Sequence, residues 1–394
     1  MLLEDKKKFQ RKSSQIFLAH CSVSPLYNEA LKEEQKIAKE QNKKGLLMMD
    51  DYLNILDNLR TAAAGLLKTK PENLAFVKNT SEGMSMIANG FRFQTGDQTI
   101  GYIHEYPANY YPWKLQERRG VEFVLLPNRD TTSGLFFSNP EGEEYWPELL
   151  PCGWSMADLE ARVTGRTRII AISHVQFTSG FAADLKQLGE FCRSHDIDLI
   201  VDAAQSLGAL PLYPEEYHIS AVVSSGWKWL MGPLGTGIMY TSEEFRAKIG
   251  DVQVGAGLMI QGTDFLNHSW HPHTSAKRFE YSTCPVSLAA SLTACIKDLP
   301  EPEKSRDELF RLQNLIVNLL DPDRFTPVKF PEPHRSGILS VICRRDNPQK
   351  IEKKLQSKGI VVSERSGYIR FAPHFYNTEE EISKALYTLD QIRV

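Results

Sequence analysis

The sequence predicts an α/β fold in which a large domain on a mostly parallel sheet is followed by a smaller C-terminal α+β domain. From about residue 73 onward, short apolar runs alternate with helical segments, which is typical of βαβ units. Several runs are apolar throughout, as expected for strands covered on both faces. After about residue 262 this rhythm loosens. We therefore divide the chain into an N-terminal arm and helix (1–45), a large domain (46–262) and a small domain (263–394).

The N-terminal region predicts an arm and two helices. Ser24 is the expected N-cap of the first helix, with Pro25 at its first position and a charged, solvated face to about Lys44. The second helix, over about 50–67, carries apolar residues at helical spacing. It is therefore expected to pack on a core.

The large domain is expected to alternate strands with helices. The predicted strands cover 74–77, 122–126, 168–175, 199–203, 221–224 and 237–240, and the predicted helices cover 81–90 and 185–195. The small domain is expected to hold helices over 285–299, 306–320 and 348–358 and from 378, with strands over 337–343, 359–362 and 368–371.

Composition excludes several classes of protein. A chain that is 42% hydrophobic and 24% charged has enough apolar material for a core and is not disordered. The formal net charge of −3 gives no general attraction to nucleic acid. No apolar window approaches the roughly 18 residues of a membrane span, and the six cysteines form no CxxC spacing. We expect a cytoplasmic protein with reduced thiols and no nucleic-acid or membrane partner.

An acid and an amine follow two neighbouring apolar strands. Asp202 ends one strand, and Lys228 comes just after the next, within a turn that contains Ser225. The carboxyl ends of strands in an open α/β sheet face the ligand crevice. Apolar and aromatic neighbours such as Trp227 and Trp229 would desolvate the amine and favour its neutral, nucleophilic form.

This pair suits pyridoxal 5'-phosphate (PLP). The lysine would form the Schiff base, and the carboxylate would keep the pyridine nitrogen protonated so that the ring accepts electrons. A structural aspartate and a surface lysine are the alternative for either residue alone. The pair in this sequence context favours PLP.

The segments VDAAQSLGALPL (201–212) and SSGWKWLMGPLGTGIMY (224–240) resemble the class V aminotransferase family. This group of PLP enzymes includes cysteine desulfurases and isopenicillin-N-epimerase-like proteins. The Asp202-x-x-Gln205…Lys228 spacing is the most specific match, and the resemblance extends from about Phe17 to the C-terminus. It implies the PLP-dependent transferase fold type I, with a seven-stranded sheet, and a role for Gln205 in binding the cofactor.

The phosphate of the cofactor has a candidate site. Asn79, Thr80 and Ser81 place hydroxyl groups and backbone N–H groups at a predicted helix start, which can bind an anion or simply cap the helix. In the family this turn holds the phosphate, and Thr80 and Ser81 match it. Ser225 matches a further phosphate ligand, and Trp227 stands where desulfurases have a histidine.

Other resemblances concern the cofactor ring and the partner subunit. Tyr106 matches the position whose aromatic ring stacks on the cofactor. Phe177 stands where the family has an asparagine near the ring oxygen, which weakens a simple transfer of substrate chemistry. Thr283 resembles the threonine that reaches the phosphate of the neighbouring subunit, which implies a homodimer with shared active sites.

Arg370 resembles the arginine that binds the substrate carboxylate, a role for which its planar guanidinium is suited. Desulfurases carry a nucleophilic cysteine shortly before that arginine. The closest preceding cysteine here is Cys343, on a predicted strand, which disfavours a desulfurase that forms a persulfide. His268 and two nearby histidines lack obvious Cys or acidic companions, so we expect no metal.

The sequence therefore predicts a PLP enzyme acting at the α-carbon of a small amino acid. Lys228 would form the Schiff base and then serve as general base, while Asp202 keeps the ring an electron sink. An aminotransferase is the main expectation, with a C–S or other β-lyase or an epimerase as the alternative. A non-catalytic PLP-binding protein is a second alternative. The substrate side chain is expected to be selected by loops such as Phe17–Ser24 and Gly255–Thr274.

Overall fold

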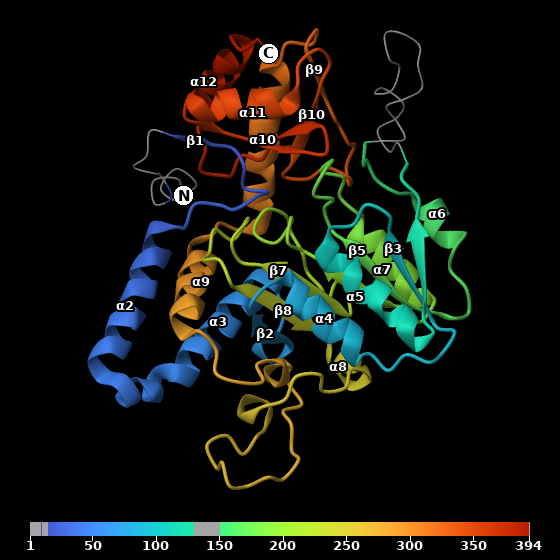
Figure 1. Ribbon diagram of the computed structural model, residues 1–394, viewed down its shortest axis with the longest axis vertical. Helices are drawn as coiled ribbons and strands as arrows, with labels where there is room; N and C mark the ends of the chain where they lie inside the picture. Colours follow the sequence, from blue (N-terminus) through green and yellow to red (C-terminus); the bar gives the residue numbers. More distant parts are fainter. Residues whose placement is uncertain (1–8, 10–14, 130–149, 394) are drawn as a thin grey trace.

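A computed structural model describes residues 9, 15–129 and 150–393, so most of the predicted arm before residue 15 lies outside the described residues. The large domain contains a seven-stranded sheet (Figure 1), as predicted. Its order is β2 (Leu74–Val77), β8 (Gly237–Thr241), β7 (Ala221–Ser225), β6 (Asp198–Asp202), β5 (Thr167–Ser173), β3 (Gln98–Tyr102), β4 (Glu122–Leu126). Of these seven strands only β8 runs in the opposite direction to the others, so the predicted mostly parallel sheet is confirmed.

Helices cover both faces of this sheet because the strand side chains alternate between two apolar clusters. Ile170 and Ile172 point to the face packed by α3 (Tyr52–Leu67), α7 (Leu185–Ser194) and α9 (Val286–Asp298). Ile169 and Ala171 point to the opposite face. That face is packed by α4 (Thr80–Gly90), α5 (Tyr111–Lys114) and α8 (Glu243–Lys248). A sheet buried on both faces explains the continuous apolar runs in the sequence.

The small domain is a four-stranded antiparallel sheet with helices packed on it. Its order is β12 (Ser363–Arg365), β13 (Tyr368–Phe371), β10 (Leu339–Cys343), β9 (Phe325–Pro327). Apolar residues of α10 (Pro302–Leu319), α11 (Pro348–Ser357) and α12 (Glu379–Asp390) fill its core. Helix α9, which follows residue 262, packs against α3 and α2 (Asn28–Lys44), which precede it. The division at residue 262 stays a prediction.

The N-terminal arm crosses from the small domain to the large one. Strand β1 (Ile16–Phe17) pairs in parallel with β11 (Ile360–Val361), and α2 (Asn28–Lys44) packs along α9 (Figure 1). The predicted N-cap at Ser24 is wrong, because the helix begins at Asn28. The Ser24 hydroxyl instead donates to the Lys228 carbonyl oxygen at 2.6 Å, which ties the arm to the large domain.

The remaining elements are short. They are α6 (Met156–Glu160) and the 3₁₀ helices η1 (Gly45–Asp51), η2 (Pro71–Asn73), η3 (Pro107–Asn109), η4 (Leu115–Arg119), η5 (Ala256–Leu258) and η6 (Ala276–Phe279). Within the described residues, none of the helices combines the length and the apolar character needed to cross a membrane.

Candidate active site

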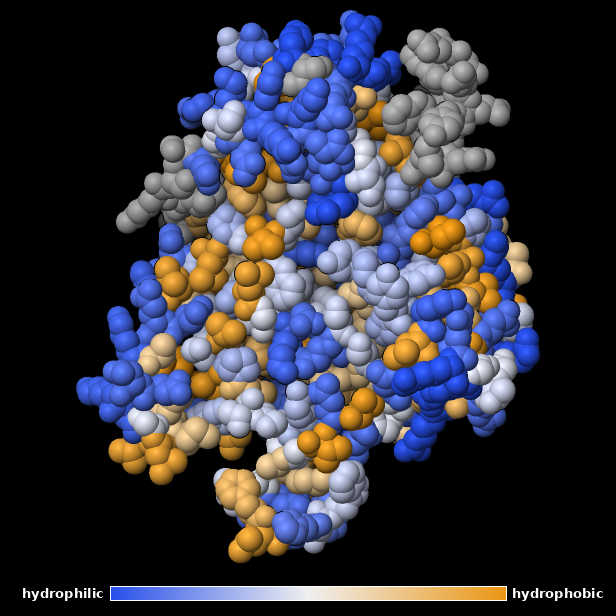
Figure 2. Space-filling view, in the orientation of Figure 1, coloured by the Kyte–Doolittle hydropathy of each residue, from blue (hydrophilic) through white to orange (hydrophobic). Residues whose placement is uncertain are grey.

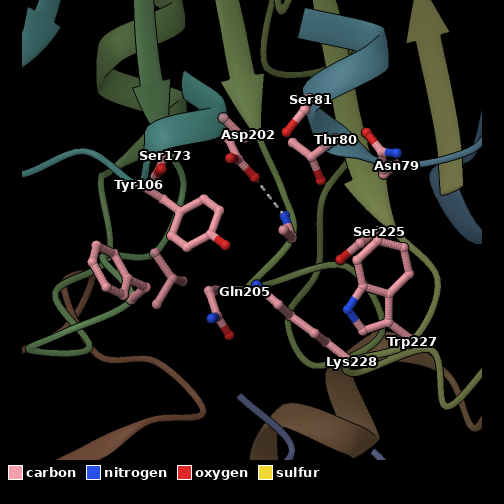
Figure 3. A pocket seen from close by; sticks show the side chains of 14 residues that line it. Asn79, Thr80, Ser81, Tyr106, Ser173, Asp202, Gln205, Ser225, Trp227 and Lys228 are labelled. Carbon is pink, nitrogen blue, oxygen red and sulfur yellow. Dashed lines mark hydrogen bonds between the residues drawn. The ribbon is translucent and has the colours of Figure 1, made fainter. Parts of the chain in front are cut away.

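A cavity of about 300 Å³ opens at the carboxyl ends of β5, β6 and β7, where α4 begins (Figure 3). Fourteen side chains surround it, namely those of Asn79, Thr80, Ser81, Tyr106, Ala108, Ser173, Val175, Phe177, Asp202, Ala204, Gln205, Ser225, Trp227 and Lys228. The cavity therefore brings together eight of the ten site residues that the sequence predicted, all except Thr283 and Arg370.

Lys228 lies on the turn after β7 and extends into the middle of the cavity (Figure 3). Its amine lies 5.5 Å from the centre of the Tyr106 ring. Burial lowers the pKa of Lys228 below its usual range, and the Asp202 carboxylate partly opposes that shift. The lysine is thus poised toward its neutral form, which can attack a carbonyl carbon.

Asp202 ends β6 and is almost fully buried at the cavity floor. One of its carboxylate oxygens accepts a hydrogen bond from the Ala204 amide at 2.9 Å (Figure 3). Burial raises the pKa of Asp202, while this amide and the Lys228 amine lower it. A buried carboxylate is suited to hold a proton on the nitrogen of a ligand ring that lies against it.

A buried acid that the sequence analysis missed braces this edge of the sheet. Glu105 accepts hydrogen bonds from the Ser173 amide at 2.8 Å, from the Ser173 hydroxyl and from Gln176 Nε2 at 3.1 Å. It connects the turn that carries Tyr106 with the segment that follows β5. Burial raises the pKa of Glu105 to about 7, and the nearby Asp202 charge adds to the rise. No clear signal in the sequence marked it, because the preceding strand β3 carries polar residues and was not predicted.

Two buried hydroxyl groups at one end of the cavity lack partners. Among the described residues, neither Thr80 Oγ1 nor Ser225 Oγ has a hydrogen-bond partner. Both line the cavity with Ser81 at the N-terminus of α4, where the helix dipole favours an anion. The helix can approach β7 closely because a Cβ on Gly83 would lie 2.5 Å from Val223 Cγ1. This end fits a phosphate group.

Aromatic rings line two sides of the cavity. Tyr106 and Phe177 pack edge to face, with their ring centres 5.3 Å apart. The Tyr106 side chain is 46% exposed, so one side of it remains open to a ligand. The Trp227 indole flanks the cavity beside Ser225 (Figure 3). Flat surfaces of this kind suit an aromatic cofactor ring.

Gln205 connects the cavity to the N-terminal arm. Its Nε2 donates to the Cys21 carbonyl oxygen at 2.8 Å, and its Oε1 accepts from the Trp229 indole at 3.1 Å. The amide nitrogen carries a second hydrogen that can serve a ligand. Cys21 and the Ser22 that follows it were not singled out in the sequence, because their partners lie far along the chain.

The two predicted residues outside the lining lie in different surroundings. Arg370, on β13, is buried and donates to the backbone oxygen of Phe177, a lining residue. Thr283 is exposed, and its role toward a neighbouring subunit stays a prediction. Cys343 lies on β10, as expected, and burial raises the pKa of its thiol to about 12. Among the described residues, no three His, Cys, Asp or Glu side chains converge on a metal position.

The fold and this cavity define an α/β enzyme of the kind that binds a carbonyl cofactor through a lysine. The chain belongs to the class V aminotransferase family, whose model matches residues 22–134 and 153–384. The family is PLP-dependent, and PLP is the cofactor of this enzyme. The cavity fits each part of PLP. The unpartnered hydroxyls of Thr80 and Ser225 suit its phosphate, and the aromatic side chains suit its ring. Asp202 suits the ring nitrogen, and Lys228 suits the aldehyde.

Relatives and solved structures carry related names. The chain is 25% identical to a probable cysteine desulfurase of Methanothermobacter thermautotrophicus, covering 86% of this chain and 83% of the relative. It is 24% identical to one of Pyrococcus abyssi, covering 84% and 82%. Among solved structures, the cystine C–S lyase C-DES bound to cysteine persulfide has a TM-score of 0.83 at 20% identity, covering 96% and 98%. A cysteine desulfurase of Thermococcus onnurineus has a TM-score of 0.82 at 20% identity, covering 98% and 97%.

Proposed function

We propose that this enzyme is a PLP-dependent C–S lyase that acts on a small sulfur-containing amino acid of the cysteine or cystine type. The observation that carries the proposal is the Lys228 amine facing Asp202 across one cavity with orphan hydroxyls at its end. The names of the relatives, desulfurase and C–S lyase, favour cleavage of a C–S bond over the transamination that the sequence analysis put first.

The residues divide the chemistry among them. PLP, when bound, supplies the electron sink that stabilises negative charge at the substrate α-carbon. Thr80, Ser81 and Ser225 would hold its phosphate, and Asp202 would hold a proton on its ring nitrogen. Lys228 Nζ would bind its aldehyde group and is the base placed to take the proton from the substrate α-carbon.

Residues in and beside the cavity wall would complete the reaction site. Arg370 binds the substrate carboxylate, which orients the α-carbon toward Lys228. Tyr106, whose ring centre lies 5.5 Å from the Lys228 amine, and Phe177, which packs against it, would offer aromatic surfaces to the cofactor ring. Since Phe177 offers no side-chain amide, any contact to the ring oxygen comes from another group, and Gln205 is placed for it.

An aminotransferase is the second candidate, because the same lysine, carboxylate and arginine serve transamination equally well. The absence of a cysteine between Cys343 and Arg370 favours it over a desulfurase with a nucleophile in that segment. An epimerase and a non-catalytic PLP-binding protein are further alternatives. A carboxylate-binding arginine placed beside the cavity argues for turnover.

We also propose that the enzyme is a homodimer in the cytoplasm. A long segment after α8 projects from the large domain, and hydrophobic side chains gather on it (Figures 1 and 2). Its exposed apolar residues are Val252, Val254, Ile260, Phe265, Leu266 and Trp270. Thr283 is exposed shortly after this segment, where a partner could receive it. Light scattering that gave the mass of a single chain across micromolar concentrations would contradict the dimer. The cytoplasmic location rests on the composition.

The decisive experiment incubates PLP-loaded enzyme with L-cysteine, L-cystine, L-alanine and L-serine. Sulfide or persulfide released together with pyruvate and ammonia, without a keto-acid acceptor, supports the lyase. Turnover that requires a keto acid supports the aminotransferase and rejects the lyase. The matched control is Lys228→Ala, since free PLP in solution also degrades cysteine slowly. If that variant released sulfur at the wild-type rate, the proposal would fail.

A further inference from the structure

The guanidinium of Arg370 is buried, and one edge of it lacks a full set of partners in the part of the chain that the structure describes. Its side chain is 2% exposed, yet both of its described partners are uncharged oxygens. Nη1 donates to the Phe177 carbonyl oxygen, and Nε has no partner among the described residues. A buried cation without a charged partner is costly, so this arrangement points to an anion that binds at the free edge.

That edge is shared with a serine of the N-terminal arm. Arg370 Nη2 donates to the Ser22 hydroxyl oxygen over a long 3.3 Å. The edge formed by Nε and Nη2 matches the two oxygens of a carboxylate. Because Phe177 holds Nη1, the guanidinium is anchored at its other end, while on this edge Nε has no described partner and Nη2 has none besides Ser22. A carboxylate at the edge would meet the Ser22 hydroxyl as a third donor.

The position of Ser22 is fixed from both sides. The residue before it, Cys21, accepts a hydrogen bond from Gln205, which lines the cavity. Two residues further on, the Ser24 amide donates to the Trp227 carbonyl oxygen at 2.9 Å, and its hydroxyl donates to that of Lys228. The arm is thus attached to the backbone of the same turn that carries the reactive amine, so the segment around Ser22 is held beside that turn.

We propose that Ser22 is a carboxylate-positioning residue, which donates its hydroxyl hydrogen to the α-carboxylate that Arg370 binds. The inference rests on the proposed function, because it assumes an α-amino acid substrate. It assigns the N-terminal arm a direct part in substrate recognition. The carboxylate site is then formed by two distant segments of the chain, and neither completes it alone.

The test compares an amino acid with its amide on the PLP-loaded enzyme. L-Alanine and L-alaninamide both carry the reacting amine, but only alanine has a carboxylate. Titration follows the visible absorption of the bound cofactor and yields a dissociation constant for each ligand without turnover. Ser22→Ala should weaken alanine about tenfold, as expected for a lost hydrogen bond to a charged group, and leave alaninamide unchanged. In turnover assays KM should rise with kcat nearly constant.

Two variants serve as controls. Ser22→Thr keeps the hydroxyl and should restore alanine binding. Val23→Ala changes an exposed neighbouring side chain and should bind both ligands as the wild type does. Equal weakening of alanine and alaninamide in Ser22→Ala would assign a merely structural role, and wild-type affinity for alanine would equally overturn the proposal. If neither ligand nor any other α-amino acid perturbed the wild-type spectrum, the proposed function itself would fail.

Discussion

The buried carboxyl of Glu105 should make the stability of the protein depend on pH, and Glu105→Gln should remove that dependence. The carboxyl is 7% exposed, and its pKa rises from 4.5 to about 7 in the folded protein. The folded state therefore binds the proton more tightly than the unfolded chain does. Its contribution is complete below pH 4.5 and is lost as the pH rises through about 7.

The size of the effect follows from that difference. Each pKa unit is worth about 1.4 kcal/mol, so the rise from 4.5 to about 7 amounts to about 3 kcal/mol. Glutamine is neutral at every pH and retains an oxygen that can accept from the Ser173 amide. We therefore expect the free energy of unfolding of Glu105→Gln, minus that of the wild type, to increase by about 3 kcal/mol between pH 4.5 and pH 8. A constant difference in stability between the two proteins at low pH does not affect this increase.

Urea unfolding of both PLP-free proteins at half-unit steps of pH measures this difference directly. Subtracting the two curves cancels groups common to both, including the buried His174 and His374, whose pKa values burial lowers to about 3 and about 4. Those histidines lower the free energy of unfolding as the pH falls below 6.5, whereas Glu105 raises it as the pH falls through about 7. A stability difference that stayed flat, or that moved against the variant with rising pH, would refute the reasoning.

Three further predictions concern the cavity. Lys228→Ala should abolish the absorption of the lysine-bound cofactor and lower turnover on the order of a thousandfold. Borohydride reduction of the wild type should label this lysine, and labelling of another residue would contradict the prediction. Thr80→Ala and Ser225→Ala should weaken PLP about tenfold without lowering the stability of the PLP-free protein, because their hydroxyls have no described partner. The control Thr236→Ala loses a 2.6 Å hydrogen bond to a backbone oxygen and should lower the stability of the PLP-free protein by about 1 kcal/mol. If all three variants lost the same stability, the result would argue against the phosphate site. Ser24→Ala removes the hydroxyl that donates to the Lys228 carbonyl and should also cost about 1 kcal/mol in urea unfolding, and no change would show that the bond is solvent-compensated.

The sequence was most informative where burial leaves a continuous apolar run. Strands β2, β4 and β13 have the predicted bounds. Strand β3 was missed, because Gln98, Thr99 and Gly101 interrupt its apolar pattern although every residue in it is buried. Gln98 can be buried because its side-chain oxygen accepts a hydrogen bond from the Thr167 hydroxyl on the neighbouring strand. Polar strand residues of this kind are satisfied by tertiary partners that periodicity does not reveal.

The residues of the site likewise differ in how far the sequence could predict them. Asp202 and Lys228 could be predicted, because they follow successive strands and the topology alone brings them to one edge. Glu105, Ser22 and Ser24 could not, because their roles depend on contacts across hundreds of residues or on the exact path of a loop. Ser24 illustrates the difference, since its local pattern fits a helix cap while the fold uses its hydroxyl on Lys228.

Pairing of the arm with the small domain also sets the order in which the enzyme can mature during synthesis. His20 bonds the carbonyl oxygen of Ala372, 352 residues later, and Leu18 bonds both Val361 and Ala372. At ribosomal speeds of roughly 5–20 residues per second, the arm waits on the order of 20–70 s for these strands to emerge. Until then the large domain can fold and Ser24 can already bond the lysine turn, but residues 16–20 lack their partners in the small domain. Arg370, on β13, is made with those last strands, so the proposed carboxylate-binding side of the site should be the last part to form.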